Sequence, residues 1–147
     1  MTNKNKLRII ASYYGATLGF RRLPKGIHGY TECDRLHIVL DPRKLEGLST
    51  LFHELGHIYC VQKGLFKDYH FPDWNSKSSI RNYSNTAYKA ECWVDSWAAQ
   101  EFKSIYPDKE YTRCYYFPGN PFKTQQSKEY FQEKYTSKLV SLLKLID

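Results

Sequence analysis

The stretch STLFHELGHIYC, residues 49–60, constrains the fold more than any other, because it places two histidines and one glutamate in a segment without other charged residues. Apolar residues recur at helical spacing from residue 45 to residue 59. They predict a helix that begins near Pro42, since proline is favoured in the first turn, and ends near Gln62, with Gly64 as the stop. We therefore expect one helix to carry both imidazoles and the carboxylate.

The two histidines have the spacing of a metal-binding helix. His53 and His57 are four residues apart, so both imidazoles leave one face of the helix, one turn from each other, where two Nε2 atoms can hold one ion. Glu54 lies one step around the helix and can reach a water at the ion without being a ligand, as a general base must. The alternative is a pair of core histidines that are hydrogen-bonded within the fold.

A second segment, AECWVDSWA at residues 90–98, offers the third protein ligand that a catalytic zinc site needs. Glu91 and Asp95 are four residues apart on an otherwise apolar helix, where two carboxylates are costly to bury without a cation. Glu91 can bind the ion while Asp95 accepts a hydrogen bond from the outer nitrogen of a histidine ligand. The alternative is a solvated face whose carboxylates pair with lysines. His70 is the alternative third ligand, ahead of Asp73, His28 and His37.

Peptide hydrolysis also needs a group that stabilises the oxyanion, for which a tyrosine or histidine side chain is the usual choice. The chain has 13 tyrosines, and most of them must be packing residues. Tyr83 is our candidate, chosen from a set that also contains Tyr69, His70, Tyr88, Tyr115 and Tyr116.

The rest of the chain predicts an α+β fold with a small antiparallel or mixed sheet packed against the HELGH helix. Residues 5–18 have apolar positions at helical spacing and predict a first helix that ends between Gly15 and Gly19. Short β-prone runs on either side of residues 33–35 predict a hairpin. Further along we expect a loop at residues 64–85, the second ligand-bearing helix at 86–102 and a C-terminal helix at 127–146.

The motifs resemble those of the zincin metallopeptidases. TLFHELGHIY is similar to the extended zincin signature, and AECWVDSWA is similar to the second helix of gluzincins, which supplies a glutamate ligand. The order of HIVLDP, HELGH and a helix that begins Ala-Glu resembles the ImmA/IrrE-like metallopeptidases of bacteria, phages and mobile elements over about residues 28–102. The chain departs from that pattern at Cys92 and Trp97, where alanine and phenylalanine are usual.

The resemblance implies a zincin-like fold and a zinc-dependent peptidase, with His53, His57 and Glu91 as zinc ligands. It also implies that Glu54 is the general base and that Asp95 orients a histidine ligand. The expected substrate is a protein or peptide, since members of the family often cleave a repressor or another regulatory protein. Two alternatives stay open: a non-catalytic zinc-containing interaction module of phage or mobile-element type, and a SprT-like protease that acts near DNA.

Length and charge fit one soluble domain, residues 1–147. The chain has 41% hydrophobic residues, and its four cysteines form no C-x-x-C pair, which excludes a zinc ribbon. The net charge is +7, but the 22 lysines and arginines are spread along the chain, so a nucleic-acid partner is possible but not predicted. Because we find neither a secretory signal nor a long apolar run, we expect no membrane contact and a location in the cytoplasm of a bacterium or phage-infected host.

Overall fold

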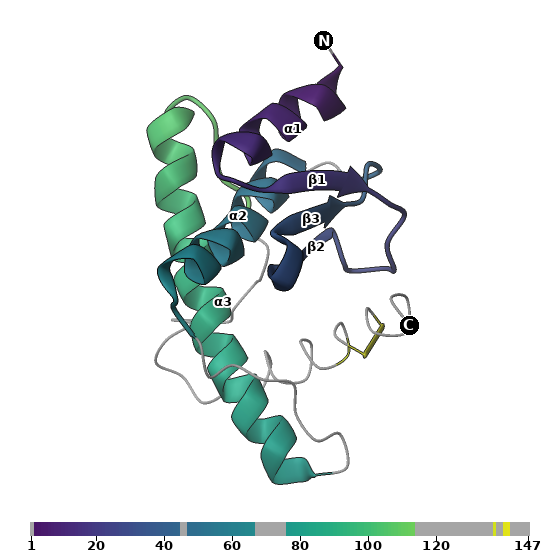
Figure 1. Cartoon of the computed structure of the whole chain (residues 1–147), viewed down its shortest axis with the longest axis vertical. Coiled ribbons are helices and arrows are strands. Elements are labelled where there is room, and N and C mark those ends of the chain that lie inside the picture. The colour runs from purple at the N-terminus through teal and green to yellow at the C-terminus, as the bar shows by residue number, and fades with distance from the viewer. Residues whose placement is uncertain (1, 45–46, 67–75, 114–136, 138–139, 142–147) are drawn as a thin grey trace. The chain divides into compact units, whose positions relative to one another are not determined.

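The computed structural model describes residues 2–44, 47–66, 76–113, 137, 140 and 141. In chain order the elements are α1 (Asn3–Tyr13), β1 (Thr17–Phe20), β2 (Gly29–Glu32), the 3-10 helix η1 (Cys33–Arg35), β3 (His37–Leu40), α2 (Gly47–Lys63) and α3 (Lys77–Ile105) (Figure 1). The fold is therefore α+β, as predicted. The predicted C-terminal helix lies outside the described residues, except that residues 137, 140 and 141 are helical.

The chain contacts define two compact units. The first comprises Met1–Leu65 and Val94–Cys114, and the second comprises Phe66–Trp93 and Tyr115–Asp147. The first unit contains α1, the sheet, α2 and the C-terminal part of α3, and α3 continues through the boundary after Trp93 without a break. The assignment of residues 1–147 to one domain stays a prediction.

The sheet has three strands in the order β1-β3-β2 and is mixed. β2 and β3 form the predicted antiparallel hairpin around η1, with Thr31 opposite Ile38. β1 pairs in parallel with β3, so that Leu18 lies beside Ile38. The chain reverses at Leu36, which follows η1 with a left-handed backbone (φ 47°). Thr31, Ile38 and Leu18 are therefore neighbours on one face of the sheet.

The first helix is shorter than predicted. It ends at Tyr13, and Leu18, which we expected at its end, lies in β1 instead. Gly15 adopts a left-handed backbone (φ 82°) and ends the helix, as the N–H groups of Gly15 and Ala16 donate to the carbonyls of Ser12 and Ala11. A Cβ at Gly15 would lie 2.8 Å from Nε2 of Gln62, but this is the end of a flexible side chain that can move, so the positive φ is the main reason for glycine there.

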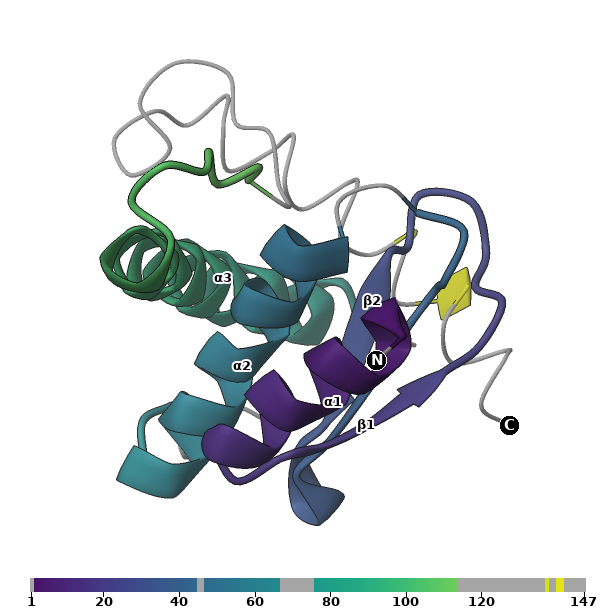
Figure 2. The same ribbon diagram turned by 90° about the horizontal axis from the view of Figure 1, so that it is seen from above.

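α1 and α2 pack against one face of the sheet, where they enclose the main hydrophobic core (Figure 2). The core contains apolar side chains from both helices and from the strands. The buried members of the core are Leu7, Ala11, Ala16, Leu18, Ile38, Leu40, Leu51, Leu55 and Ile58. α2 contacts both β2 and β3, and these contacts fix the orientation of the helix that carries the HELGH motif relative to the sheet.

The C-terminal part of α3 packs against α2 through a second cluster. Phe52, Ala98 and Phe102 are buried there, and the rings of Phe52 and Phe102 meet edge to face at 5.5 Å. Gly56 allows the close approach of the two helices, since a Cβ at that position would lie 2.6 Å from Cγ1 and 3.1 Å from the carbonyl oxygen of Val94. The glycine of the HELGH motif therefore has a packing role.

The ends of α2 confirm one prediction and correct another. Gly64 has a left-handed backbone (φ 66°) and ends the helix as predicted, with the N–H of Leu65 donating to the carbonyl of Cys60. The described part of α2 begins at Gly47, and residues 42–44, where we expected the helix to start, are not helical. Pro42 and Arg43 form a turn instead, and the side chain of Asp41 holds this turn.

Asp41 is a buried carboxylate that joins two segments of the first unit. Its Oδ2 accepts hydrogen bonds from the N–H of Leu23 and from Nη2 of Arg43, and its Oδ1 accepts from the N–H and Nε of Arg43. The hydrogen bond from Arg43, and then those from the two backbone N–H groups, hold the pKa of Asp41 far below its usual value despite burial.

α3 is longer than predicted, because it begins at Lys77 and not near Thr86. Residues 77–85 are therefore helix rather than loop. Ser76 precedes the helix, and its Oγ accepts a hydrogen bond from the N–H of Ser79, as an N-cap residue does. Neither α3 nor any other helix in the described part of the chain is long and apolar enough to cross a membrane.

Asp41→Asn should lower the free energy of unfolding at neutral pH by about 1–2 kcal/mol, because hydrogen bonds to a charged acceptor are lost. The folded-state pKa of Asp41 is lowered, so its stabilisation is complete above the unfolded-state pKa of about 3.9 and is lost as the pH falls further. Wild type and Asp41→Asn should therefore converge in acid, which denaturant titrations across pH measure. The exposed Asp34→Asn is the control, and an equal loss in both variants would contradict the role of Asp41.

Gly56→Ala should lower the free energy of unfolding by about 1–3 kcal/mol, since the new methyl group would overlap Val94. This overlap outweighs the gain of about 1 kcal/mol in helix propensity. Gly47→Ala is the matched control, because nothing lies within 4 Å of a Cβ at Gly47. Chemical denaturation of both variants tests the close contact of α2 with α3, which equal stabilities would contradict.

Candidate metal centre

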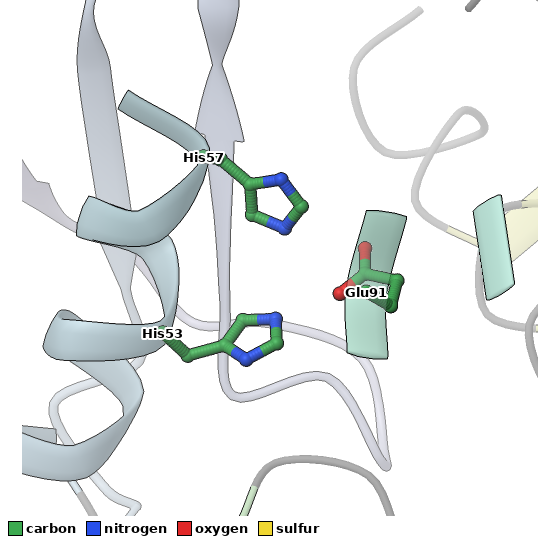
Figure 3. Close-up of side chains that lie close together, drawn as sticks. All are labelled: His53, His57 and Glu91. Atoms are coloured by element: carbon green, nitrogen blue, oxygen red, sulfur yellow. The ribbon is translucent and has the colours of Figure 1, made fainter. Parts of the chain in front are cut away.

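His53 and His57 leave the same face of α2, as their spacing predicts (Figure 3). His53 is buried, with 1% of its surface exposed, and His57 is half-buried. The two ring centroids lie 5.3 Å apart. The helix therefore presents two imidazole rings side by side at the edge of the core.

Glu91 of α3 completes a group with these two histidines. One nitrogen of each imidazole and one carboxylate oxygen of Glu91 all lie within 4.8 Å of one another. Figure 3 shows both rings and the carboxylate turned toward one another from two helices. These three side chains are the ligands predicted from the sequence, and together they can hold a metal ion.

Both acidic residues of AECWVDSWA are buried, with 5% of Glu91 and none of Asp95 exposed. The alternative of a solvated acidic face is therefore wrong. A carboxylate is costly to bury unless a positive charge or several hydrogen bonds compensate it. Glu91 lies in a group with His53 and His57 that can hold a cation, and a bound cation would offset the cost of its burial.

Asp95 lies one turn after Glu91 and contacts the first histidine. Its Oδ1 is 3.3 Å from Nδ1 of His53. An ionised Asp95 places the proton of the neutral imidazole on Nδ1, which leaves the lone pair of Nε2 for a metal ion. The structure thus joins Asp95 to His53 as the sequence predicts.

Two further side chains bind the carboxylate of Asp95. The hydroxyl of Tyr111 donates to Oδ1 at 2.5 Å, and Nη1 of Arg113 donates to Oδ2 at 2.8 Å. Burial alone would raise the pKa of Asp95, but the contact with His53, the hydrogen bond from Tyr111 and the charge of Arg113 outweigh it, so the pKa is lowered. Asp95 is therefore ionised at neutral pH.

Glu54 is buried beside the histidines, with 7% of its surface exposed. The hydroxyl of Thr31 in β2 donates a hydrogen bond of 2.6 Å to Oε2 of Glu54 and also lies 3.3 Å from its backbone carbonyl oxygen. Thr31 reaches α2 because it shares the face of the sheet on which Ile38 lies. The hairpin therefore sets the orientation of the predicted general base.

Sequence reasoning missed Thr31, Tyr111 and Arg113. A buried aspartate needs donors, which is a signal that Asp95 must have partners, but no periodicity links it to residues 16 and 18 positions later. The positions of two predicted side chains, those of His70 and Tyr83, are not described. His70, the alternative ligand, lies outside the described residues, and Tyr83 lies in α3 but its side chain is not described.

Comparison with known proteins found no matching family model, no matching curated protein and no matching solved structure. The function must therefore be argued from the arrangement of the side chains. Three properties carry that argument: the mutual distances of the donor atoms, the burial of the carboxylates and the hydrogen bonds that orient them.

Glu91→Ala should weaken metal binding more than Asp95→Ala does, because Glu91 supplies a ligand atom whereas Asp95 orients one. Loss of an orienting partner typically costs about 10–100-fold in metal affinity. Competition with a chromophoric chelator measures both affinities. Glu101→Ala is the control on the same helix, since its carboxylate accepts a hydrogen bond from Tyr14 away from the histidines. The reverse order would mean that Asp95 is the ligand.

Proposed function

We propose that the chain is a zinc-dependent metallopeptidase that hydrolyses peptide bonds of a protein substrate. The observation that carries the proposal is the group of His53, His57 and Glu91, with the carboxylate of Glu54 buried beside it. Two imidazole nitrogens and one carboxylate oxygen form a donor set that zinc accepts. Three protein ligands are the number typical of catalytic zinc sites, whereas structural sites have four.

Glu54 is the general base in this mechanism. Among the described residues only Thr31 donates to its carboxylate, and it does so at Oε2, so Oε1 can take a proton from the attacking water. Glu54 then delivers this proton to the leaving amine. A zinc ion in the site supplies Lewis acidity, which polarises the substrate carbonyl and brings the pKa of water toward about 7.

A hydrogen bond orients one of the three proposed zinc ligands. Asp95 accepts the Nδ1 proton of His53 and so keeps Nε2 directed at the ion. His57 on α2 and Glu91 on α3 supply the other two ligand atoms. Tyr83 stays our candidate for the group that stabilises the oxyanion, since α3 carries it two turns before Glu91.

The resemblance of HELGH and AECWVDSWA to zincin motifs supports the same function. It suggests a member of the ImmA/IrrE-like metallopeptidases that acts on a regulatory protein in the cytoplasm of a bacterium or phage-infected host. The half-buried position of His57, next to the buried His53, supports a site that a substrate can reach from one side.

Glu54→Gln should leave zinc bound but reduce hydrolysis by about 10²–10⁴-fold, the contribution of a positioned general base. Zinc content by mass spectrometry and cleavage of an unfolded protein substrate measure the two effects on the same samples. Glu32→Gln is the matched control, because Glu32 of β2 pairs with Arg35 on the surface. Undiminished cleavage by Glu54→Gln would eliminate the mechanism. Zinc binding by wild type without any hydrolysis would favour the non-catalytic interaction module.

A further inference from the structure

Three consecutive residues after α3 bind the two helices that carry the metal centre. Tyr111 and Arg113 donate to the carboxylate of Asp95 on α3. Between them, the N–H of Thr112 donates to Oγ of Ser49, in the first turns of α2, at 3.0 Å. We call Tyr111–Arg113 the strap. It forms hydrogen bonds with both helices at positions that sequence spacing does not reveal.

The strap fixes both oxygens of Asp95. Oδ1 is shared by the hydroxyl of Tyr111 and Nδ1 of His53, and Oδ2 is bound by Arg113. A carboxylate held at both oxygens cannot rotate without breaking a hydrogen bond in a fully buried place, where a lost bond is expensive. The direction in which Asp95 accepts from His53 is therefore set by the strap.

Arg113 also forms an ion pair with the carboxylate of Asp95. Asp95 has no exposed surface, and its guanidinium partner is 55% exposed, so the ion pair joins a buried anion to a cation that is still partly hydrated. The attraction between the two charges therefore adds to the hydrogen bond that holds Oδ2 of Asp95 in place.

We infer that the strap is a positioning element that sets the affinity of the site for its metal, through Asp95 and His53. This inference rests on the proposed metal site but goes beyond it, because Tyr111 and Arg113 bind Asp95 and are not members of the group that can hold the ion. The effect must also be reciprocal, since two linked equilibria share one coupling free energy. Metal binding therefore stabilises the strap as much as the strap stabilises metal binding.

The test compares four variants of the whole chain. Tyr111→Phe removes only the hydroxyl and keeps the ring, which packs against Phe102 at 5.6 Å. Arg113→Gln removes the guanidinium group, and with it both the charge and the hydrogen bond to Asp95. The controls are Tyr14→Phe, which removes a hydroxyl from Glu101, and Arg35→Gln, which removes a charge from Glu32. Each control thus loses a hydrogen bond to a carboxylate of the same kind, away from Asp95.

Zinc affinity by chelator competition is the first measurement. Tyr111→Phe and Arg113→Gln should each bind zinc about 10-fold more weakly than wild type, the lower end of the range for partners that orient a ligand. The two controls should keep the wild-type affinity. The visible absorption spectrum of the cobalt-substituted protein should change in the two strap variants alone, because it reports the geometry of the ligands.

Amide hydrogen exchange at Thr112 is the second measurement, made on wild type. Addition of zinc should slow the exchange of this N–H, which donates to Ser49. Unchanged exchange, or variants that lose stability but bind zinc as wild type does, would overturn the inference and leave the metal centre intact. If wild-type protein binds no zinc, the metal centre is wrong and the inference falls with it.

Discussion

The structure depends on the burial of three carboxylates, Glu54 on α2 and Glu91 and Asp95 on α3. Asp95 has no exposed surface, and Glu54 and Glu91 are almost as deeply buried. Burial of an ionised carboxylate without partners is prohibitive, so each of them must find a donor or a cation. Asp95 lies against His53 and accepts from Tyr111 and Arg113, Glu54 accepts from Thr31, and Glu91 faces two imidazoles. The donors for each carboxylate come from separate parts of the chain.

The helices can share these partners only because they approach closely. Gly56 offers no side chain toward Val94, and the aromatic cluster around Phe52 and Phe102 holds the helices together beyond the site. Apolar packing thus supplies the stability that the buried polar groups cost, and the same contact brings His53 within reach of Asp95. Close packing and the polar network are two aspects of one interface.

Regular spacing made part of this arrangement predictable from the sequence. The four-residue steps between His53 and His57 and between Glu91 and Asp95 define faces of single helices, so they follow from local geometry. The end of α1 at Gly15 is also a local feature, because the left-handed backbone that ends the helix favours glycine. The partner of Glu54 comes from a strand, and the donors to Asp95 come from the irregular segment after α3. Such long-range contacts produce no periodic pattern in the sequence.

The hydrogen bond from Thr31 to Glu54 separates two properties of the site. Asp95, which contacts His53, lies on α3 and is held by the strap, whereas Thr31, which holds Glu54, lies on the β2-β3 hairpin. In the proposed mechanism, substitutions in the hairpin would therefore alter proton transfer by Glu54 and leave His53, His57 and Glu91 in place. Turnover and metal retention would then respond to different parts of the chain, although Glu54 and His53 are adjacent residues of one helix.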